Sequence, residues 1–406
     1  MGVDVRDSEK FMSQSCIFAP EILLPVPSVD MTAWAVIACD QHTSDQSYWE
    51  KLEKLVGDKP STLRLTLPEI YLNGDYSSRI SEICETMRTY KGKGIFRKLP
   101  KGFILTERST PYVPMRRGIV LAIDLEAYSY EKKSDALIRA SEQTILERIP
   151  PRVKIREGAP LEFPHIMLLY DDPDDIVMRS FADEDLPVLY DFDLNMGGGH
   201  IRGKFIKNFS KVINLFDSLI CNGLLFMVGD GNHSLATAKV IWDRKKETLS
   251  PEERLHHPAR FALCEAVNLH DDGIYFEAIH RVVKGINTEK FLSGCKPFGK
   301  GKGSLYVGGK RTDYGVAVDV PAAVAGVDAY ISKYIAENGG EVDYIHGESA
   351  VQELTKVNSD CVGICLPKMK KSELFPQVNQ YGSLPRKTFS MGESEEKRYY
   401  IEGKEI

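Results

Sequence analysis

The sequence contains no run of about 18 consecutive apolar residues, which is the length that a membrane-spanning helix requires. Its N-terminus, MGVDVRDSEK, carries charges of both signs and lacks the apolar segment of a secretory signal peptide. These absences favour a soluble cytoplasmic protein that has no membrane partner.

An excess of positive charge is also missing. The chain has 52 Lys and Arg against 58 Asp and Glu, and its formal net charge is −6. Surfaces that bind nucleic acid need Lys and Arg in clustered excess. We therefore expect small-molecule partners and no nucleic acid, and we leave the oligomeric state open.

Cysteine is present but scattered. The eight cysteines lie far apart, and Cys361 and Cys365 form the one close pair. No second pair or nearby histidine completes a zinc site. The pattern favours reduced, buried thiols over a disulfide framework.

The common nucleotide and hydrolase motifs are absent. The sequence has no G-x-x-x-x-G-K-[ST] loop, no H-R-D with D-F-G, no G-x-G-x-x-G after a first strand, no H-E-x-x-H and no G-x-S-x-G. The scaffolds that carry these motifs are therefore not the first choice for this chain.

What is present is an alternation of helix and strand patterns over 406 residues, which is long enough for two domains. We expect an α/β region over 1–290 that contains the catalytic residues and a phosphate-binding turn. We also expect a smaller α/β region over 291–406, whose segment LPRKTFS lies close to those residues. Strands are predicted at 97–109, 116–128 and 223–230, and a Gly- and Lys-rich hairpin at 296–320. Helices are predicted from Thr43–Asp45 onward, at 78–91, and at 134–150, where Pro150 and Pro151 are expected to end the helix.

The segment VGDGNHS, residues 228–234, joins an apolar strand to a helix through a glycine-framed turn. Free N–H groups at a helix start form an anion site, and Gly231 would let a phosphate approach the backbone. Asn232, His233 and Ser234 can donate to phosphate oxygens, and Asp230 could orient Mg²⁺ or an acceptor hydroxyl. An ordinary capped turn explains the same residues about equally well.

A second turn, CDQHTS at 39–44, follows the strand pattern WAVIACD. Asp40 could accept the proton of an attacking hydroxyl there, beside Gln41, His42 and Thr43. A plain helix cap with a surface histidine is the simpler interpretation of the pattern alone.

Basic residues mark three further segments that could contact phosphate, because Arg side chains match phosphate oxygens and keep their charge. Each could equally be a solvated loop. They are the run around the Pro pair with Arg148 and Arg152, the segment LPRKTFS with Arg386 and Lys387, and the turn GGGH with His200.

Long stretches of the chain, among them AWAVIACDQHTSDQSYWEKL, VGDGNHSLATAK and LPRKTFSMGESEEKRYY, resemble a microbial family catalogued as a domain of unknown function. The resemblance covers nearly the whole chain. Its GDGNHS turn is similar to the Asp-Gly-His-His-Arg turn of free-serine kinases built on the ParB/sulfiredoxin fold, with Asn232 in place of the first His and Ser234 in place of the Arg. Some relatives of the family resemble pyrophosphate-dependent L-serine kinases.

This resemblance implies a mixed α/β fold with a ParB/sulfiredoxin-like core elaborated by extra elements. It implies a kinase that moves a phosphoryl group from pyrophosphate to L-serine with Mg²⁺ and releases O-phospho-L-serine. The roles carried over are general base for Asp40, second carboxylate for Asp230, and phosphate binding for Gly231, Asn232, His233, Ser234, Arg148, Arg152, Arg386 and Lys387. We further expect His233 to take part in catalysis and Gln41, His42, Thr43 and His200 to bind substrate. Asp230 is also the expected metal ligand.

Several alternatives stay open. The donor could be ADP or ATP, and water could replace serine in a phosphatase or pyrophosphatase. A nucleotide-binding ParB-like module is the non-enzymatic alternative, and the acidic balance of the chain counts against its DNA-binding form. A sulfiredoxin-like enzyme needs a cysteine in the phosphate turn, whereas Cys221 precedes the strand.

Overall fold

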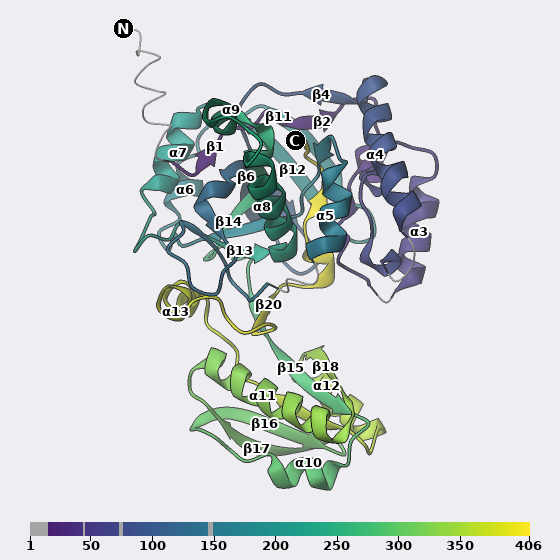
Figure 1. Ribbon diagram of the computed structural model, residues 1–406, viewed down its shortest axis with the longest axis vertical. Helices are drawn as coiled ribbons and strands as arrows, with labels where there is room; N and C mark the ends of the chain where they lie inside the picture. The colour runs from purple at the N-terminus through teal and green to yellow at the C-terminus, as the bar shows by residue number, and fades with distance from the viewer. Residues whose placement is uncertain (1–14, 44, 73–75, 145–148) are drawn as a thin grey trace. The chain divides into compact units, whose positions relative to one another are not determined.

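Figure 1 shows a computed structural model of the protein, which describes residues 15–43, 45–72, 76–144 and 149–406. The chain forms two compact units. Unit 1 contains Met1–Ile274 and Glu393–Ile406, and unit 2 contains Tyr275–Gly392. Both units combine helices with a sheet, which confirms the mixed α/β class. Residue 290, the expected boundary, lies in α10 (Thr288–Gly294) of unit 2.

The main sheet of unit 1 has ten strands in the order β11-β12-β5-β6-β14-β10-β13-β8-β7, with β1 beside β6. Most neighbours are antiparallel, whereas β10 with β14, β13 with β8, and β7 with β8 are parallel. The strands are β1 (Ile17–Phe18), β5 (Phe103–Ser109), β6 (Arg116–Asp124), β7 (Tyr128–Ser129), β8 (Ile138–Ala140), β10 (Met167–Tyr170), β11 (Val188–Asp193), β12 (His200–Ile206), β13 (Phe226–Asp230) and β14 (Phe261–Asn268).

Both faces of this sheet are buried. In β6, Ile119 and Leu121 belong to one hydrophobic core and Val120 to another, because successive side chains of a strand point to opposite faces. Helices complete both cores (Figure 1). The first core includes residues of α6 (Ile176–Arg179), α7 (Phe209–Asp217) and α8 (Asn232–Lys246), and the second those of α2 (Met31–Trp34), α3 (Gln46–Val56) and α4 (Ser77–Gly92).

The helix predicted at 134–150 is wrong. Residues Ile138–Ala140 form the buried strand β8, and α5 (Ile149–Glu157) begins at the proline pair that was expected to end a helix. Proline is favoured in the first turn of a helix, where its missing N–H has no partner to lose and its fixed φ already suits the helix. The proline pair therefore marks the start of a helix and not its end.

Unit 2 is built on a sheet of six strands in the order β17-β16-β19-β15-β18, with β20 beside β15. The predicted hairpin is confirmed, because β16 and β17 pair through Gly308 and Gly309, both at positive φ. The elements are β15 (Phe276–Lys284), β16 (Gly301–Val307), β17 (Lys310–Val316), α11 (Val320–Asn338), β18 (Glu341–His346), α12 (Glu348–Val357), β19 (Val362–Cys365), α13 (Leu374–Tyr381) and β20 (Phe389–Met391). Within the described residues of either unit, every helix is too short or too polar to cross a membrane.

The last part of the chain, Glu393–Ile406, belongs to unit 1, and we call it the C-terminal strap. Its strand β21 (Tyr399–Tyr400) pairs with β3 (Val36–Ile37), the predicted strand that leads to Asp40. Its strand β22 (Lys404–Glu405) pairs with β9 (Leu161–Glu162). The strap is therefore bound along its length to segments from the first half of the chain.

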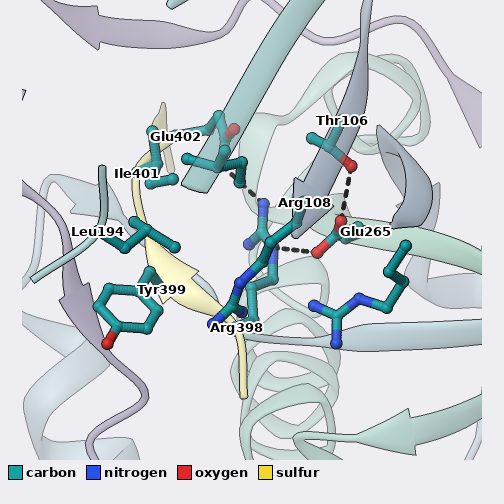
Figure 2. A pocket seen from close by; sticks show the side chains of 10 residues that line it. Thr106, Arg108, Leu194, Glu265, Arg398, Tyr399, Ile401 and Glu402 are labelled. Carbon is teal, nitrogen blue, oxygen red and sulfur yellow. Dashed lines mark hydrogen bonds and ion pairs between the residues drawn. The ribbon is translucent and has the colours of Figure 1, made fainter. Parts of the chain in front are cut away.

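Buried arginines fix the strap (Figure 2). Arg398, on the strap itself, forms ion pairs with Glu265 of β14 at 3.0 Å and with Glu402 at 2.7 Å. Arg108 of β5 donates to the backbone carbonyls of Glu395 and Lys397, both at 2.6 Å. Because these side chains are buried, each ion pair lies where an unpaired charge is costly.

Replacing Arg398 by Met should lower the free energy of unfolding of unit 1 by about 3 to 5 kcal/mol, because Glu265 and Glu402 would stay buried without their ion pair. Lys59→Met is the control, since the exposed pair of Lys59 with Asp30 should contribute less than about 1 kcal/mol. Urea unfolding followed by tryptophan fluorescence measures this, because Trp34, Trp49 and Trp242 all lie in unit 1. Equal losses in both variants would contradict the account of the strap.

Candidate functional site

Three strand ends meet at one edge of the main sheet of unit 1. Strand β8 runs parallel to β13, and β10 runs antiparallel to it with Met167 opposite Asp230. The residues after β8 and β13 and those before β10 therefore share an edge. This edge brings together Ser141, His165 and Asp230, and the Ser141 hydroxyl donates to the Val228 carbonyl at 2.5 Å.

The predicted turn at 230–234 lies at this edge. Gly231 is the N-cap of α8 with φ of 80°, and a Cβ there would lie 3.1 Å from Ile166 Cα, so the turn requires glycine. Gly231 has no side chain to cap the helix, whose first-turn N–H groups and dipole favour an anion. Asn232 adds a buried Oδ1 that has no hydrogen-bond partner among the described residues.

Asp40 follows β3 and lies next to the buried side chains of His165 and Tyr400. Its Oδ1 accepts from the Gln41 amide at 3.0 Å, and its Oδ2 is 3.6 Å from His165 Nε2. The Asp40 side chain is 28 % exposed, so a substrate can reach it.

Tyr400 of the strap orients His165. The Cys39 N–H donates to the Tyr400 oxygen at 3.0 Å, and the Tyr400 hydroxyl lies 2.9 Å from His165 Nδ1. Burial raises the pKa of Tyr400 far above its ordinary value, so the hydroxyl keeps its proton and stays neutral.

Lys397 of the strap links the two carboxylates. Its Nζ is 3.3 Å from Asp230 Oδ2, and its charge also acts on Asp40. Burial alone would raise the pKa of Asp40, but the charge and hydrogen bond of His165, the Gln41 amide and Lys397 outweigh it, so the pKa is lowered. Asp40 is therefore ionised at neutral pH.

A cavity of about 140 Å³ adjoins these residues. Its polar part includes His165, Tyr400, and Ser234 and Thr237 of α8, and its apolar part comes mainly from Leu65, Leu67, Met87, Ile155 and Phe163. The helix that begins at the glycine turn thus shares one cavity with the residues beside Asp40. Such a concave site with a few convergent polar groups is typical of small-molecule binding.

Asp40 and Asp230 could hold a metal ion only if a bound ligand supplied further coordinating atoms. No group of three His, Cys, Asp or Glu side chains in the described residues could hold a metal. Asp230 already accepts from the Gly231 N–H at 2.8 Å and faces Lys397. Mg²⁺ needs no complete protein cage, because one or two carboxylates, waters and substrate phosphates commonly hold it.

The other predicted residues are placed as follows. Thr43 is exposed, and His42 stacks on Tyr48 with ring centroids 3.7 Å apart. His200 is held between Asp191 and Asp193, on a strand that four others separate from β13, so the structure does not bring it to Asp230. Arg148 lies outside the described residues, as does the side chain of Arg152, while Arg386 and Lys387 belong to unit 2. The roles of these residues stay predictions.

Three residues of the site were not predicted: His165, Lys397 and Tyr400. The string EKRYY, which contains Lys397 and Tyr400, ends one of the stretches that carry the family resemblance. A signal was therefore present for these two residues, but nothing local in the sequence links this string or His165 to Asp40.

The family described as "Protein of unknown function (DUF1015)" matches residues 23–400. The chain belongs to this DUF1015 family. The match spans both turns, the cavity and the strap as far as Tyr400. None of the curated proteins matches the chain.

Solved structures similar to this DUF1015 protein have low sequence identity. A free serine kinase in complex with AMP is 12% identical, with 70% of this chain and 90% of that chain covered and a TM-score of 0.40. SbnI with a C-terminal truncation, from Staphylococcus aureus, is 10% identical, with 67% and 82% covered and a TM-score of 0.38. A conserved hypothetical protein from Pyrococcus furiosus is 11% identical, with 71% and 94% covered and a TM-score of 0.36.

An anion site at this turn predicts that Gly231→Ala weakens binding of inorganic pyrophosphate, used here as a probe anion, by about tenfold or more, because the new methyl group meets Ile166 and displaces the turn. Gly94→Ala is the matched control, since Gly94 also has positive φ but its Cβ would meet nothing within 4 Å. Both variants should lose about 1 to 3 kcal/mol of stability from backbone strain. Isothermal titration calorimetry distinguishes them, and equal pyrophosphate affinities would show that the turn does not bind the anion.

Proposed function

We propose that this protein is a small-molecule kinase that transfers a phosphoryl group from pyrophosphate to the hydroxyl of free L-serine. The observation that carries the proposal is Lys397, which lies against Asp230 and acts on Asp40 beside the start of α8. One anion-binding helix end, one fixed cation and one ionised carboxylate at a common edge are the parts that phosphoryl transfer requires.

In the proposed reaction, the serine hydroxyl oxygen attacks a phosphorus atom of pyrophosphate. The bond from that phosphorus to the bridging oxygen breaks, phosphate leaves with the electron pair, and the hydroxyl proton passes to Asp40. Asp40 is suited to this role because it is ionised and partly exposed. His165 and Tyr400 act as positioning residues that hold the carboxylate.

The first turn of α8 would hold the phosphates. Gly231 allows close approach, and Asn232 and Ser234 offer side-chain hydrogen-bond donors at the same helix end. Lys397 would hold a further phosphate oxygen as a point charge. Transfer needs positioning and charge neutralisation, and these groups supply both.

The net negative charge of the proposed site with pyrophosphate bound also favours a metal ion that binds together with the pyrophosphate. Asp40 and Asp230 carry two negative charges, Lys397 carries one positive charge, and pyrophosphate adds several more negative charges. Asp230 is the residue that would hold Mg²⁺ entering with the phosphates, and the ion would neutralise charge on the phosphate oxygens.

The size of the cavity supports pyrophosphate over a nucleotide. Pockets for drug-sized ligands commonly span about 300 to 1,000 Å³, whereas this cavity has about 140 Å³. Pyrophosphate and serine are both small and polar, and neither requires a base-binding pocket.

Asp40→Asn should lower kcat for formation of O-phospho-L-serine by about 10²- to 10⁴-fold, because the amide cannot accept the hydroxyl proton. Asp58→Asn, which removes an exposed carboxylate in the turn after α3, should leave kcat unchanged. The rate of phosphoserine formation from L-serine and pyrophosphate measures both. Full activity of Asp40→Asn would refute the assignment of the base.

Lys397→Met should move the acid limb of the pH profile of kcat/KM to higher pH. Asp40 must be ionised to act, so activity falls as the pH drops through its pKa. Loss of the Lys397 charge raises that pKa, and the fall then begins at a higher pH. Because the pKa of Asp40 lies below its ordinary value, profiles of wild type and Lys397→Met from about pH 2 to 6, with Lys59→Met as control, measure the shift. Profiles of equal shape would mean that Lys397 does not act on the base.

A further inference from the structure

The strap carries a carboxylate without a cation two residues before Lys397. This residue is Glu395, which is half-buried. Its neighbours have partners, since Lys397 faces Asp230 and Arg398 pairs with two carboxylates. Arg108 contacts Glu395 at its backbone carbonyl and not at its carboxylate. In the described ranges of the chain, no Lys, Arg or His forms an ion pair with that carboxylate. Glu395 therefore offers a negative charge that a cationic ligand can balance.

Aromatic side chains surround this charge. The charge of Glu395 acts on His42, Tyr48, Tyr112 and Tyr399. The rings of His42 and Tyr48 stack with their centroids 3.7 Å apart. The charge of Glu395 raises the pKa of the exposed Tyr112 above its ordinary value. The carboxylate is therefore close to the stacked pair and to both other tyrosines.

The stacked pair has hydrogen-bond acceptors to spare. The atom Nε2 of His42 is buried and has no hydrogen-bond partner among the residues that the structure describes. Burial lowers the pKa of His42 against the opposing charge of Glu395, so the ring is neutral at pH 7 and keeps one acceptor nitrogen. Tyr48 is 6% exposed, and its hydroxyl is directed at the Tyr399 oxygen, which leaves its own lone pairs without a donor from the described chain. Buried polar atoms in this state are rare and costly.

The loop that carries His42 is strained and lies next to the proposed base. His42 has a φ of 50°, which is a conformation that side chains rarely adopt and that is common at functional sites. The indole N–H of Trp49 donates to its carbonyl at 3.1 Å and holds the loop. Two residues of chain span at most about 7 Å, so His42 stays close to Asp40 and Glu395 stays close to Lys397. The acceptors and the carboxylate therefore adjoin the group that takes the hydroxyl proton in the proposed reaction.

We propose that Glu395 binds the ammonium group of the amino acid that this site phosphorylates, with His42 Nε2 and the Tyr48 oxygen as further acceptors. An ammonium group has three N–H donors, and these three acceptors match them. The inference rests on the proposed function and defines its acceptor class, which is small alcohols with a protonated amino group on the carbon next to the hydroxyl-bearing carbon. L-serine has this arrangement, so its hydroxyl reaches Asp40 while its ammonium group contacts Glu395.

Isothermal titration calorimetry of the full chain with three small molecules tests the proposal. L-serine and ethanolamine carry the ammonium group, whereas 3-hydroxypropionate is L-serine without its amino group. Glu395→Gln should weaken binding of L-serine and ethanolamine by about tenfold or more, because the neutral amide loses the ionic hydrogen bond. The affinity for 3-hydroxypropionate should be equally low in wild type and Glu395→Gln. The control Glu393→Gln makes the same change at an exposed residue of the strap and should bind all three molecules as wild type does.

The kinetic constants separate this proposal from the proposed reaction. Glu395→Gln should raise KM for L-serine and leave KM for pyrophosphate unchanged. Equal L-serine affinity in wild type and Glu395→Gln overturns the proposal but leaves the reaction standing if wild type forms phosphoserine. A rise in KM for pyrophosphate alone assigns Glu395 to the phosphate part of the site and also overturns it. If wild type neither binds L-serine nor forms phosphoserine, the acceptor and the proposal both fall. Glu395 is half-buried and has no ion pair to lose in the described chain, so the variant should fold as wild type does.

Discussion

The buried ion pairs of Arg398 with Glu265 and Glu402 are the constraint on which the candidate site depends. They fix the strap at a residue that directly follows Lys397 and precedes Tyr400 by two positions. Pairing of β21 with β3 then places Lys397 against Asp230 and the Tyr400 hydroxyl against His165. Because residues 398–404 of the strap are buried, their side chains are held in one arrangement before any substrate arrives, which is the preorganisation that electrostatic catalysis needs.

The site also depends on the antiparallel direction of β10. If β10 ran parallel to β13, the residue before it would lie at the opposite edge from Asp230. With the observed direction, His165 and Asp230 come from neighbouring strand ends, and Asp40 reaches them from β3. The proposed reaction therefore uses one short region, in which Asp40 is the proposed base, the start of α8 the proposed phosphate site, and Lys397 the cation beside Asp230.

The sequence predicts those parts of the fold that are set locally. The strand, glycine turn and helix from 226 to 246, the helix after Asp45 and the hairpin around Gly308 all follow from apolar periodicity, caps and turn residues. Asp40 and Asp230 are predicted for the same reason, since Asp230 ends a strand and Asp40 lies shortly after one.

His165, Lys397 and Tyr400 could not be found in this way. Their positions depend on the pairing of β21 with β3 and of β10 with β13, which joins segments far apart in the chain, and periodicity carries no information about such partners. The helix predicted at 134–150 is wrong for a different reason. The buried strand β8 and the start of α5 at the proline pair together produce an apolar spacing that resembles that of a single helix.

The most direct test of the central claim is ³¹P NMR of the full chain with Mg²⁺ and L-serine, in separate samples that contain pyrophosphate, ADP or ATP. The account predicts that the O-phospho-L-serine signal grows with pyrophosphate and is absent with the nucleotides. Phosphoserine formed from ADP or ATP would contradict the donor and keep the kinase. Release of orthophosphate from pyrophosphate without any phosphoserine would contradict the transfer reaction itself and identify the site as that of a hydrolase.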